Sequence, residues 1–362
     1  MSSTGTDPFP HQRQRNPFRL GVFTRLVDEV PPPRRYTRAL ELLMTADRLG
    51  FDTGWVAQHH AGNEGGLPSP LVFLAAAAQY TRRLTLATGI ITLALENPVR
   101  LAEDAAVLAA LSNGRLELGF GTGGGEPAFA IFGVPFEDRQ QEYDRAFAVV
   151  CDALAGQELS PAGSTLFPPA RPLLATVWEA TFGVAGAVRA AEHGSGLLLA
   201  RTAIRPGQNG ASGATAAHRP LGEAQSELVE AYLGSWSHPD ITPRIGLSRS
   251  LYVAPTRVEA FREAEAGLRR SATQLAGRGG LDPHAPMADL VTRSDLHLGC
   301  PDDVIASLSA DRLLPLATDL ILQVHPADPG HQETLRSLEL IRNEVAPSLG
   351  WSPATAPRAA QL

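Results

Sequence analysis

The segment from Arg83 to Gly125 constrains the fold most, because it contains a complete β-α-β unit. Residues 84–93 are almost all Leu, Ile, Thr, Ala and Gly, which is typical of a parallel strand covered on both faces. Asn97, followed by proline, predicts the start of a helix, and Gly114 predicts its end. Residues 116–120 form the next predicted strand. This order of elements is the repeat of a parallel α/β fold.

The rest of the chain repeats the alternation of strand and helix. Further strands are predicted at residues 18–24, 51–57, 173–181, 196–200, 244–254 and 319–324. Eight strands with intervening helices favour a (β/α)8 TIM barrel over a doubly wound open sheet. In both folds, ligands bind at the C-terminal ends of the strands, and the opposite end serves stability.

Three segments read as insertions in this barrel, after strands 4, 6 and 7. They are residues 126–139, the loop Pro206–Pro220, and an irregular stretch at 279–298. The loop Pro206–Pro220 has no periodicity, and we expect it to act as a lid. We divide the chain into a flexible N-terminal segment (1–17), the barrel (18–350) and a C-terminal tail (351–362).

The chain contains no lysine, since all 31 of its basic residues are arginine. This absence argues against Schiff-base aldolases, pyridoxal-phosphate enzymes and P-loop NTPases, which each depend on a lysine. The net charge of −7 argues against nucleic-acid binding. The apolar runs are too short to span a bilayer, and the N-terminus does not resemble a signal peptide. We therefore expect a cytoplasmic protein.

Two histidines follow the strand at residues 51–57, at the ligand-binding end of the predicted barrel. Histidine is the side chain most readily poised as an acid or base near neutral pH. We favour His59 as the catalytic residue, although these histidines could instead cap and support a loop. His325, just after the last strand, is a second candidate. A metal site formed by His59, His60 and His325 remains a further possibility.

Two glycine-containing segments are candidates for cofactor binding. Thr88 and Gly89 lie within a strand, where glycine normally weakens the structure. A flat ring could lie against the backbone at Gly89, or the glycine could accommodate a bulky neighbour; both interpretations stay open. Gly121 and Thr122 begin a glycine-rich loop that can offer backbone N–H groups to an anion.

A second candidate anion site follows the fifth and sixth predicted strands. Thr181, Phe182 and Gly183 join a strand to a helix, so that free N–H groups and the helix dipole would face the ligand-binding end. Arg201 and Thr202 leave the neighbouring strand and add a permanent cation and a hydroxyl. Together these residues predict a phosphate site.

Taken together, several motifs resemble those of the bacterial-luciferase-like flavin monooxygenases, across about residues 19–350. The matching segments are Trp55–His60, Leu86–Gly89, Asn97–Asp104, Leu111–Arg115, Gly119–Gly123, Gly299–Val304 and Glu344–Pro347. There are two departures from the family pattern. Gln58 stands where luciferases carry Glu, and Thr122 stands where they carry a phosphate-binding Arg. We expect Arg201 to take over that contact.

The resemblance implies a TIM barrel that binds reduced FMN supplied by a separate flavin reductase. The flavin and O2 would form a C4a-peroxyflavin that oxygenates a small organic substrate, with His59 assisting. The resemblance also implies a cis non-prolyl peptide at or next to Gly89–Ile90, phosphate contacts from the loops after strands four to six, and a homo-oligomer. Deazaflavin-dependent hydride transfer and a non-catalytic flavin-binding protein are the alternatives.

Overall fold

The computed structural model describes residues 18–61, 65–202, 219–276 and 281–353. Parallel strands follow one another around a sheet, and the strand at residues 319–323 pairs both with the first strand and with the strand at residues 245–253, which closes the sheet into a barrel. The barrel strands are β1 (Arg19–Thr24), β2 (Thr53–Val56), β3 (Thr85–Thr88), β5 (Leu116–Gly121), β6 (Val177–Ala180), β7 (Gly196–Leu199), β8 (Ile245–Val253) and β10 (Asp319–Gln323). The predicted (β/α)8 barrel is confirmed.

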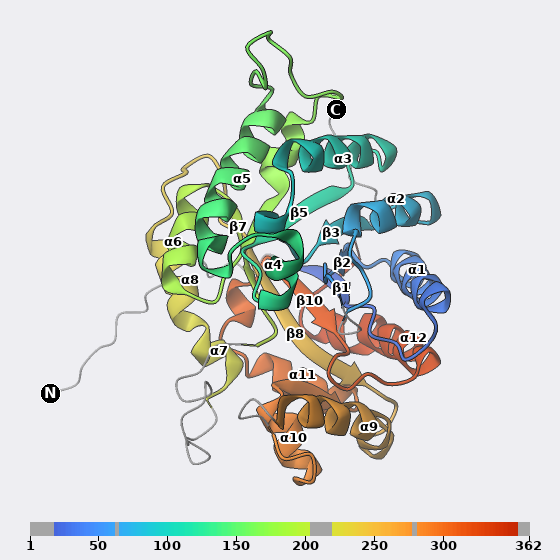
Figure 1. The fold of residues 1–362 in the computed structure, drawn as a ribbon. Helices are drawn as coiled ribbons and strands as arrows, with labels where there is room; N and C mark the ends of the chain where they lie inside the picture. The colour runs from blue at the N-terminus through green and yellow to red at the C-terminus, as the bar shows by residue number, and fades with distance from the viewer. Residues whose placement is uncertain (1–17, 62–64, 203–218, 277–280, 354–362) are drawn as a thin grey trace, which may run out of the picture.

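Helices surround the strands, as Figure 1 shows. Between successive barrel strands the chain forms α1 (Pro32–Leu49), α2 (Pro70–Tyr80), α3 (Pro98–Leu111), α5 (Arg139–Ala155), α6 (Val184–Glu192), α8 (Ser226–Gly234) and α11 (Pro301–Ser309), and α12 (His331–Leu340) follows β10. The predicted cap of α3 is confirmed, because Asn97 Oδ1 accepts the N–H of Arg100 at 3.1 Å. The helix α1 begins at Pro32, because proline suits the first helical turn.

The strand predicted at residues 84–93 is divided in the structure. The strand β3 ends at Thr88, the Gly89–Ile90 peptide is cis, and β4 (Ile91–Thr92) then pairs with β5. The predicted fifth strand is also shorter than expected. Residues 171–176 form a 3-10 helix that begins with Arg171-Pro172, and β6 starts only at Val177. Proline lacks the N–H that a central strand needs, which explains this late start.

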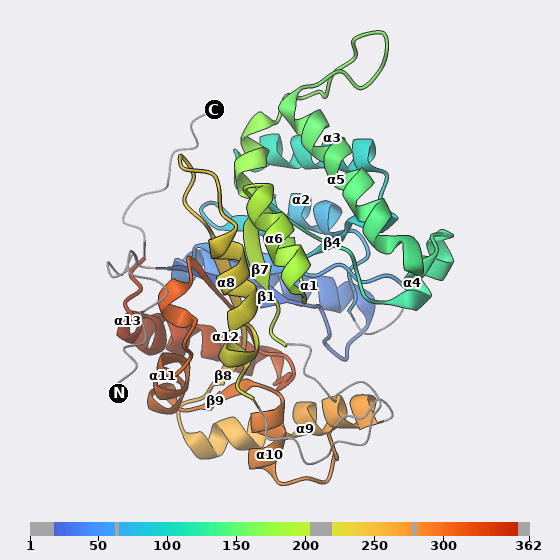
Figure 2. The ribbon, with the colours of Figure 1, turned by 90° about the vertical axis from the view of Figure 1, so that its left-hand side faces the viewer.

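The segments between and after the barrel strands carry additional elements, which are labelled in Figures 1 and 2. They are α4 (Glu126–Phe132), α7 (Leu221–Ala224), α9 (Arg257–Ala276), α10 (Met287–Arg293), β9 (Leu296–Gly299) and α13 (Ala346–Ser348). The expectation of an irregular stretch at 279–298 was wrong for α10 and for β9, which extends the sheet beside β8. Most of the loop Pro206–Pro220 lies outside the described residues, as does the segment 1–17.

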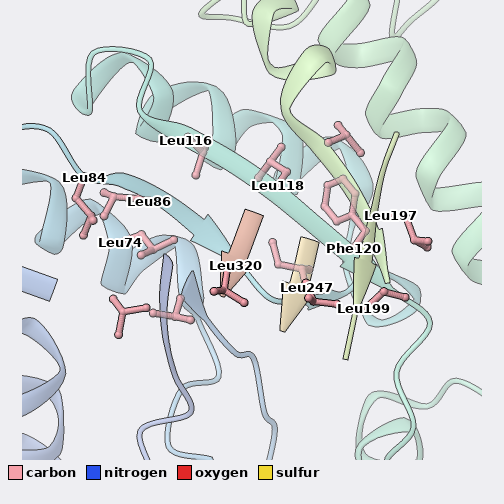
Figure 3. Packing of buried hydrophobic residues seen from close by; sticks show 14 of the residues in the cluster. Leu74, Leu84, Leu86, Leu116, Leu118, Phe120, Leu197, Leu199, Leu247 and Leu320 are labelled. Carbon is pink, nitrogen blue, oxygen red and sulfur yellow. The ribbon is translucent and has the colours of Figure 1, made fainter. Parts of the chain in front are cut away.

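Two apolar layers hold the barrel together. Leucines on the outer faces of the strands pack against the helices, among them Leu86, Leu118 and Leu320 (Figure 3). Inside the barrel, Trp55 and Trp178 meet edge to face with ring centroids 5.8 Å apart. The two faces of each strand are therefore both buried, as the near-continuous apolar runs predict.

A buried charge network lies inside the N-terminal end of the barrel. Arg19 contacts Glu117 at 2.6 Å and Asp319 at 2.6 Å. Trp178 Nε1 donates to Glu117 Oε2 at 2.7 Å. Because Arg19 and Asp319 are the first residues of β1 and β10, this network lies opposite the strand ends that bind ligands in such barrels.

The boundary predicted at residue 350 stays a prediction. Trp351 is buried, and its Nε1 donates to Asp52 Oδ2 at 2.8 Å. In the parts of the chain that the structure describes, none of the helices combines the length and the apolar character that a bilayer crossing requires.

Candidate active site

Gln58 connects the end of β2 to the neighbouring segments. Its Nε2 donates to Glu96 Oε1 at 2.7 Å and to Pro68 O at 3.2 Å. Its Oε1 accepts the N–H of Thr92 at 2.7 Å, and its own N–H reaches Ile90 O at 3.3 Å. An ionised glutamate could not donate to Glu96, which gives a physical reason for an amide at this position.

Arg25 and His59 form the central contact of the candidate site. Arg25 Nη2 lies 3.3 Å from His59 Nε2. A guanidinium group can only donate, so His59 Nε2 accepts and the imidazole proton is on Nδ1. Burial, followed by the charges of Arg25, His60 and His325, lowers the pKa of His59 to about 4. His59 is therefore a neutral imidazole at neutral pH.

Gly65 covers the ring of His59. A Cβ added at Gly65 would lie 2.4 Å from His59 Nδ1, and the φ of Gly65 is +143°, so that only glycine fits. His59 Nδ1 is buried and has no hydrogen-bond partner within the described part of the chain. A buried N–H without a partner costs about 1–3 kcal/mol, so this atom is a candidate contact for a ligand.

His60 lies against α4. Its ring centroid is 4.6 Å from that of Phe132, in an edge-to-face arrangement. Burial lowers the pKa of His60, and Glu96 opposes the shift. His60 Nε2 is also buried without a hydrogen-bond partner among the described residues. The adjacent histidines thus both favour their neutral forms.

The structure does not support a metal site formed by His59, His60 and His325. No group of three or more His, Cys, Asp or Glu side chains among residues 18–61, 65–202, 219–276 and 281–353 could hold a metal ion. His325 Nδ1 instead contacts Asp328 Oδ2 at 2.7 Å. Burial lowers the pKa of His325, and the hydrogen bond to Asp328 opposes the shift.

The cis Gly89–Ile90 peptide lies at the tip of β3, where the resemblance implies one. A Cβ at Gly89 would lie 2.8 Å from Phe23 Cε2, so the glycine accommodates a bulky neighbour on the barrel side. The hydroxyl of Thr88 donates to Gly119 O at 3.1 Å and accepts the N–H of Gly119 at 2.8 Å. This hydroxyl therefore joins β3 to β5, and a contact from Thr88 to a cofactor stays a prediction.

Gly121 and Thr122 follow the neighbouring strand tip. Gly121 is the buried last residue of β5 and packs against Ile90, since an added Cβ would lie 3.1 Å from Ile90 Cδ1. Thr122 is partly exposed. These residues therefore lie beside the cis peptide, and contacts from them to a phosphate stay a prediction.

The loop after β6 has the geometry expected for a helix N-terminus. Gly183 is the N-cap of α6, and its N–H donates to Thr181 Oγ1 at 3.1 Å. Thr181 Oγ1 also donates to Gly183 O at 3.1 Å. The side chain of Phe182 is 53% exposed, which leaves it available to a bound molecule.

Arg201 and Thr202 follow β7, which pairs with β6. Burial lowers the pKa of Arg201 to about 10; the charge of Arg25 adds to the shift, and Asp328 and Asp295 oppose it. The carbonyl of Thr202 accepts Gln225 Nε2 at 3.4 Å. Arg201 thus lies in the same electrostatic environment as Arg25, at the mouth of the barrel.

Arg25, Gln323 and Asp328 also lie at the candidate site and were not predicted from the sequence. Arg25 directly follows β1, Gln323 ends β10 and Asp328 lies in the loop after it. Arg25 and Gln323 could have been found by the rule that ligands bind at the C-terminal ends of the strands. The contact between Asp328 and His325 required tertiary structure.

A further histidine and a tryptophan are part of the scaffold. His193 Nδ1 contacts Glu179 Oε1 at 2.8 Å, and this hydrogen bond raises the pKa of His193. The Trp178 side chain is fully buried inside the barrel. Neither residue lies at the mouth of the barrel.

Comparison with known proteins places these observations in a family. A family model described as luciferase-like monooxygenase matches residues 18–308. The chain is 28% identical over 335 residues to 4-hydroxyprotoasukamycin monooxygenase from Streptomyces nodosus subsp. asukaensis, covering 87% of each chain. Two other curated relatives, each 36% identical, match over 145 and 121 residues, and the chain covers 42% and 31% of their lengths.

Solved structures share the fold at low sequence identity. The oxygenating constituent of 3,6-diketocamphane monooxygenase from Pseudomonas putida, in complex with FMN, is 17% identical with a TM-score of 0.70, covering 91% of this chain and 98% of that chain. The coenzyme F420-dependent tetrahydromethanopterin reductase from Methanopyrus kandleri is 17% identical with a TM-score of 0.66, covering 92% of this chain and all of that one (100%). The family match spans most of the barrel, and the chain belongs to the luciferase-like monooxygenase family.

Proposed function

We propose that this protein is the oxygenase component of a two-component, FMN-dependent monooxygenase. The observation that carries the proposal is the neutral His59, whose Nε2 accepts from Arg25 and whose buried Nδ1 lacks a protein partner among the described residues. The name of a solved relative, an oxygenating constituent in complex with FMN, supports the same assignment. Reduced FMN, when bound, would supply the electrons that activate O2 for transfer of one oxygen atom to a small organic substrate.

The residues at the mouth of the barrel fit a flavin in two respects. Two glycines, Gly89 directly after β3 and Gly121 at the tip of β5, flank Ile90 and carry no side chains of their own. Thr181, Gly183 and Arg201 follow adjacent strands and combine a helix N-terminus with a cation. We propose that the isoalloxazine lies at the first group and the phosphate at the second, with Thr122, Phe182 and Thr202 at the edge of the same site.

His59 would donate a hydrogen bond from Nδ1 to the bound flavin or substrate. The contact with Arg25 keeps the proton on that atom, and the burial that lowers the pKa keeps the ring neutral. The ring can then hold a proton at a fixed position without adding a positive charge. Gly65, which lies against the ring, would help to exclude water from that side.

A separate flavin reductase, a homo-oligomeric state and a cytoplasmic location complete the proposal. The reductase is needed because reduced flavin has to be supplied to an oxygenase component of this kind. The loop Pro206–Pro220 remains our candidate for a lid, although residues 206–218 lie outside the described residues.

Two experiments test the proposed function. Anaerobic titration should show saturable binding of reduced FMN, whereas binding of reduced F420 alone would support hydride transfer, the activity suggested by the F420-dependent structures of the same fold. A product screen with NADH and a generic flavin reductase should then give an oxygenated product. His59→Asn should lower product formation, and the exposed His284→Asn is the control. A protein that binds FMN without any turnover in this screen would be the non-catalytic alternative.

A further inference from the structure

A cavity of about 250 Å³ opens where β1 and β10 part. The two strands pair as far as Val22 and Leu322. Beyond that point β1 continues with β2 as far as Thr24, and β10 continues with β8 as far as Gln323. All four of these residues line the cavity. The cavity therefore connects the mouth of the barrel with the layer outside it.

The outer part of the cavity is apolar and enclosed by helices. Figure 1 shows α1 and α12 next to each other outside β1 and β10, and the two helices are in contact. Ala39 and Leu42 from α1 line the cavity, together with Leu338 and Ile341 from the opposite side. These side chains are at most 7% exposed. This part of the cavity therefore offers an apolar wall to a bound molecule.

The inner part of the cavity reaches the proposed flavin site. The ring of Phe23 lines the cavity and also lies against Gly89, where an added Cβ would be 2.8 Å from Phe23 Cε2. Arg25 lines the cavity and contacts His59 at 3.3 Å. Only Phe23 would thus lie between a molecule in the cavity and Gly89, where we place the flavin ring. Only Arg25 would lie between that molecule and His59.

Two buried polar atoms at the cavity lack hydrogen-bond partners in the described part of the chain. Gln323 Nε2 donates to Ser248 Oγ at 3.1 Å, but Gln323 Oε1 is unpaired, and the whole residue is only 5% exposed. Asp328 Oδ1 is also unpaired, while its Oδ2 contacts His325. The two free atoms both accept hydrogen bonds, so a ligand with an O–H group would satisfy them best.

The charged groups that line the cavity already have partners. The pairs are Arg38–Asp28 at 3.1 Å, Arg270–Glu29 at 3.4 Å, His331–Glu41 at 2.8 Å and His325–Asp328 at 2.7 Å. Arg25 contacts His59. An ionic ligand would have to break one of these pairs, and the cavity therefore favours a neutral ligand.

We propose that this cavity is the substrate subsite, and that the substrate is a neutral, mainly apolar molecule with a hydroxyl group. The apolar part would lie between α1 and α12, and the hydroxyl would donate to Gln323 Oε1. The inference rests on the proposed function for the position of the flavin. The cavity and its unpaired acceptors are independent of that function.

Binding of a matched pair of probes tests the proposal directly. Cyclohexanol has the O–H group, and methoxycyclohexane keeps the ring and the oxygen but cannot donate. Isothermal titration calorimetry should show that cyclohexanol binds about threefold to tenfold more tightly, the difference expected for one buried hydrogen bond. Gln323→Leu should remove this preference. Equal binding of the two probes by the unaltered protein would overturn the assignment of the hydroxyl to Gln323.

A cavity-filling variant tests the location of the subsite. Ala39→Leu adds a side chain to the cavity floor and should weaken cyclohexanol binding at least tenfold, by about the loss of two buried methylene contacts. Ala76→Leu, on an exposed face of α2, is the matched control and should bind as the unaltered protein does. Unchanged affinity in Ala39→Leu would contradict the proposal.

A measurement on the unaltered chain covers the case in which Ala39→Leu does not fold. Intermolecular NOEs should connect the cyclohexanol ring protons with the methyl groups of Leu338 and Ile341, and their absence at saturation would overturn the proposal. Titration of the same samples with reduced FMN separates the two failures. Retained FMN binding without these NOEs contradicts the subsite alone, whereas loss of FMN binding contradicts the proposed function.

Discussion

Arg25 Nη2 and His59 Nε2 lie 3.3 Å apart, and this contact determines where the imidazole proton is held. Because a guanidinium cannot accept, His59 carries its proton on Nδ1, the buried atom beside Gly65. The same arginine adds to the burial that lowers the pKa of His59 to about 4. Arg25 thus sets the tautomer of the candidate catalytic residue and, after burial, contributes to keeping it neutral.

Replacing Arg25 should raise the pKa of His59. In Arg25→Gln the like charge is lost while the burial remains, so the pKa should move from about 4 toward, without reaching, the ordinary value near 6.5. The imidazole nitrogen resonances in a pH titration measure this change. Arg25→Lys keeps the charge and should show a smaller shift. The control, Arg100→Gln, removes an exposed arginine from α3 and should leave the pKa of His59 unchanged.

The stability of the protein should depend on this histidine in mildly acidic solution. The folded-state pKa of about 4 is below the ordinary unfolded-state value near 6.5, so the unfolded chain binds more protons between these values. The contribution of His59 is therefore full above pH 6.5 and falls as the pH decreases toward 4. His59→Asn should make the free energy of unfolding, measured in urea, less dependent on pH in this range. An unaltered slope would contradict the lowered pKa.

Gln58→Glu should destabilise the barrel mouth at neutral pH. The new carboxylate would face Glu96, and the two hydrogen bonds that Gln58 Nε2 donates, to Glu96 Oε1 at 2.7 Å and to Pro68 O at 3.2 Å, would be lost. We expect a loss of about 1–3 kcal/mol in the free energy of unfolding at pH 8, and a smaller loss at pH 5, where one carboxyl can be protonated. The control Gln140→Glu creates a similar pair with Asp144 on an exposed helix surface and should cost only about 0.5 kcal/mol.

Arg201→Gln should weaken the preference for FMN over riboflavin. If Arg201 contacts the phosphate, its loss should reduce FMN affinity about tenfold or more and leave riboflavin affinity nearly unchanged, since a charged hydrogen bond is worth about 1.5–3 kcal/mol. Fluorescence titration with both flavins measures the ratio. Arg145→Gln, which removes an exposed arginine on α5, is the control. An equal loss for both flavins would indicate a structural role for Arg201 instead.

Glu117→Gln should destabilise the fold more than any exposed charge change. Glu117 accepts from Arg19 and from Trp178 inside the barrel, and breaking such a buried network costs about 3–5 kcal/mol. Glu142→Gln removes an exposed i,i+3 pair with Arg145 and should cost less than about 1 kcal/mol. Urea unfolding of the two variants gives the comparison. Similar values for both would contradict the structural role of the network.

The sequence predicted the elements whose signals are local. The apolar run at residues 84–93 and the Asn97 cap identified a parallel α/β repeat, and the barrel follows from eight such strands. Elements with weak local signals were missed. The strand β9 has only four residues and depends on pairing with β8. The strand β6 begins later than its apolar residues suggest, because the segment containing Pro172 forms a 3-10 helix.

The site was predictable by position but not by contact. His59 and Arg201 could be placed at the barrel mouth because they follow strands, and the resemblance predicted the cis peptide at Gly89–Ile90. The partner of His59 could not be predicted, because Arg25 follows a different strand, β1, and lies 34 residues earlier in the chain. The gap between β1 and β10 depends on where the hydrogen bonding between these two strands ends. No local sequence pattern encodes that point.

Anaerobic titration of the purified protein with reduced FMN is the measurement that tests the central claim most directly. The account predicts saturable binding at one site per chain, weakened by Arg201→Gln and retained in the control Arg145→Gln. No binding of reduced FMN, or binding of reduced F420 in its place, would contradict it.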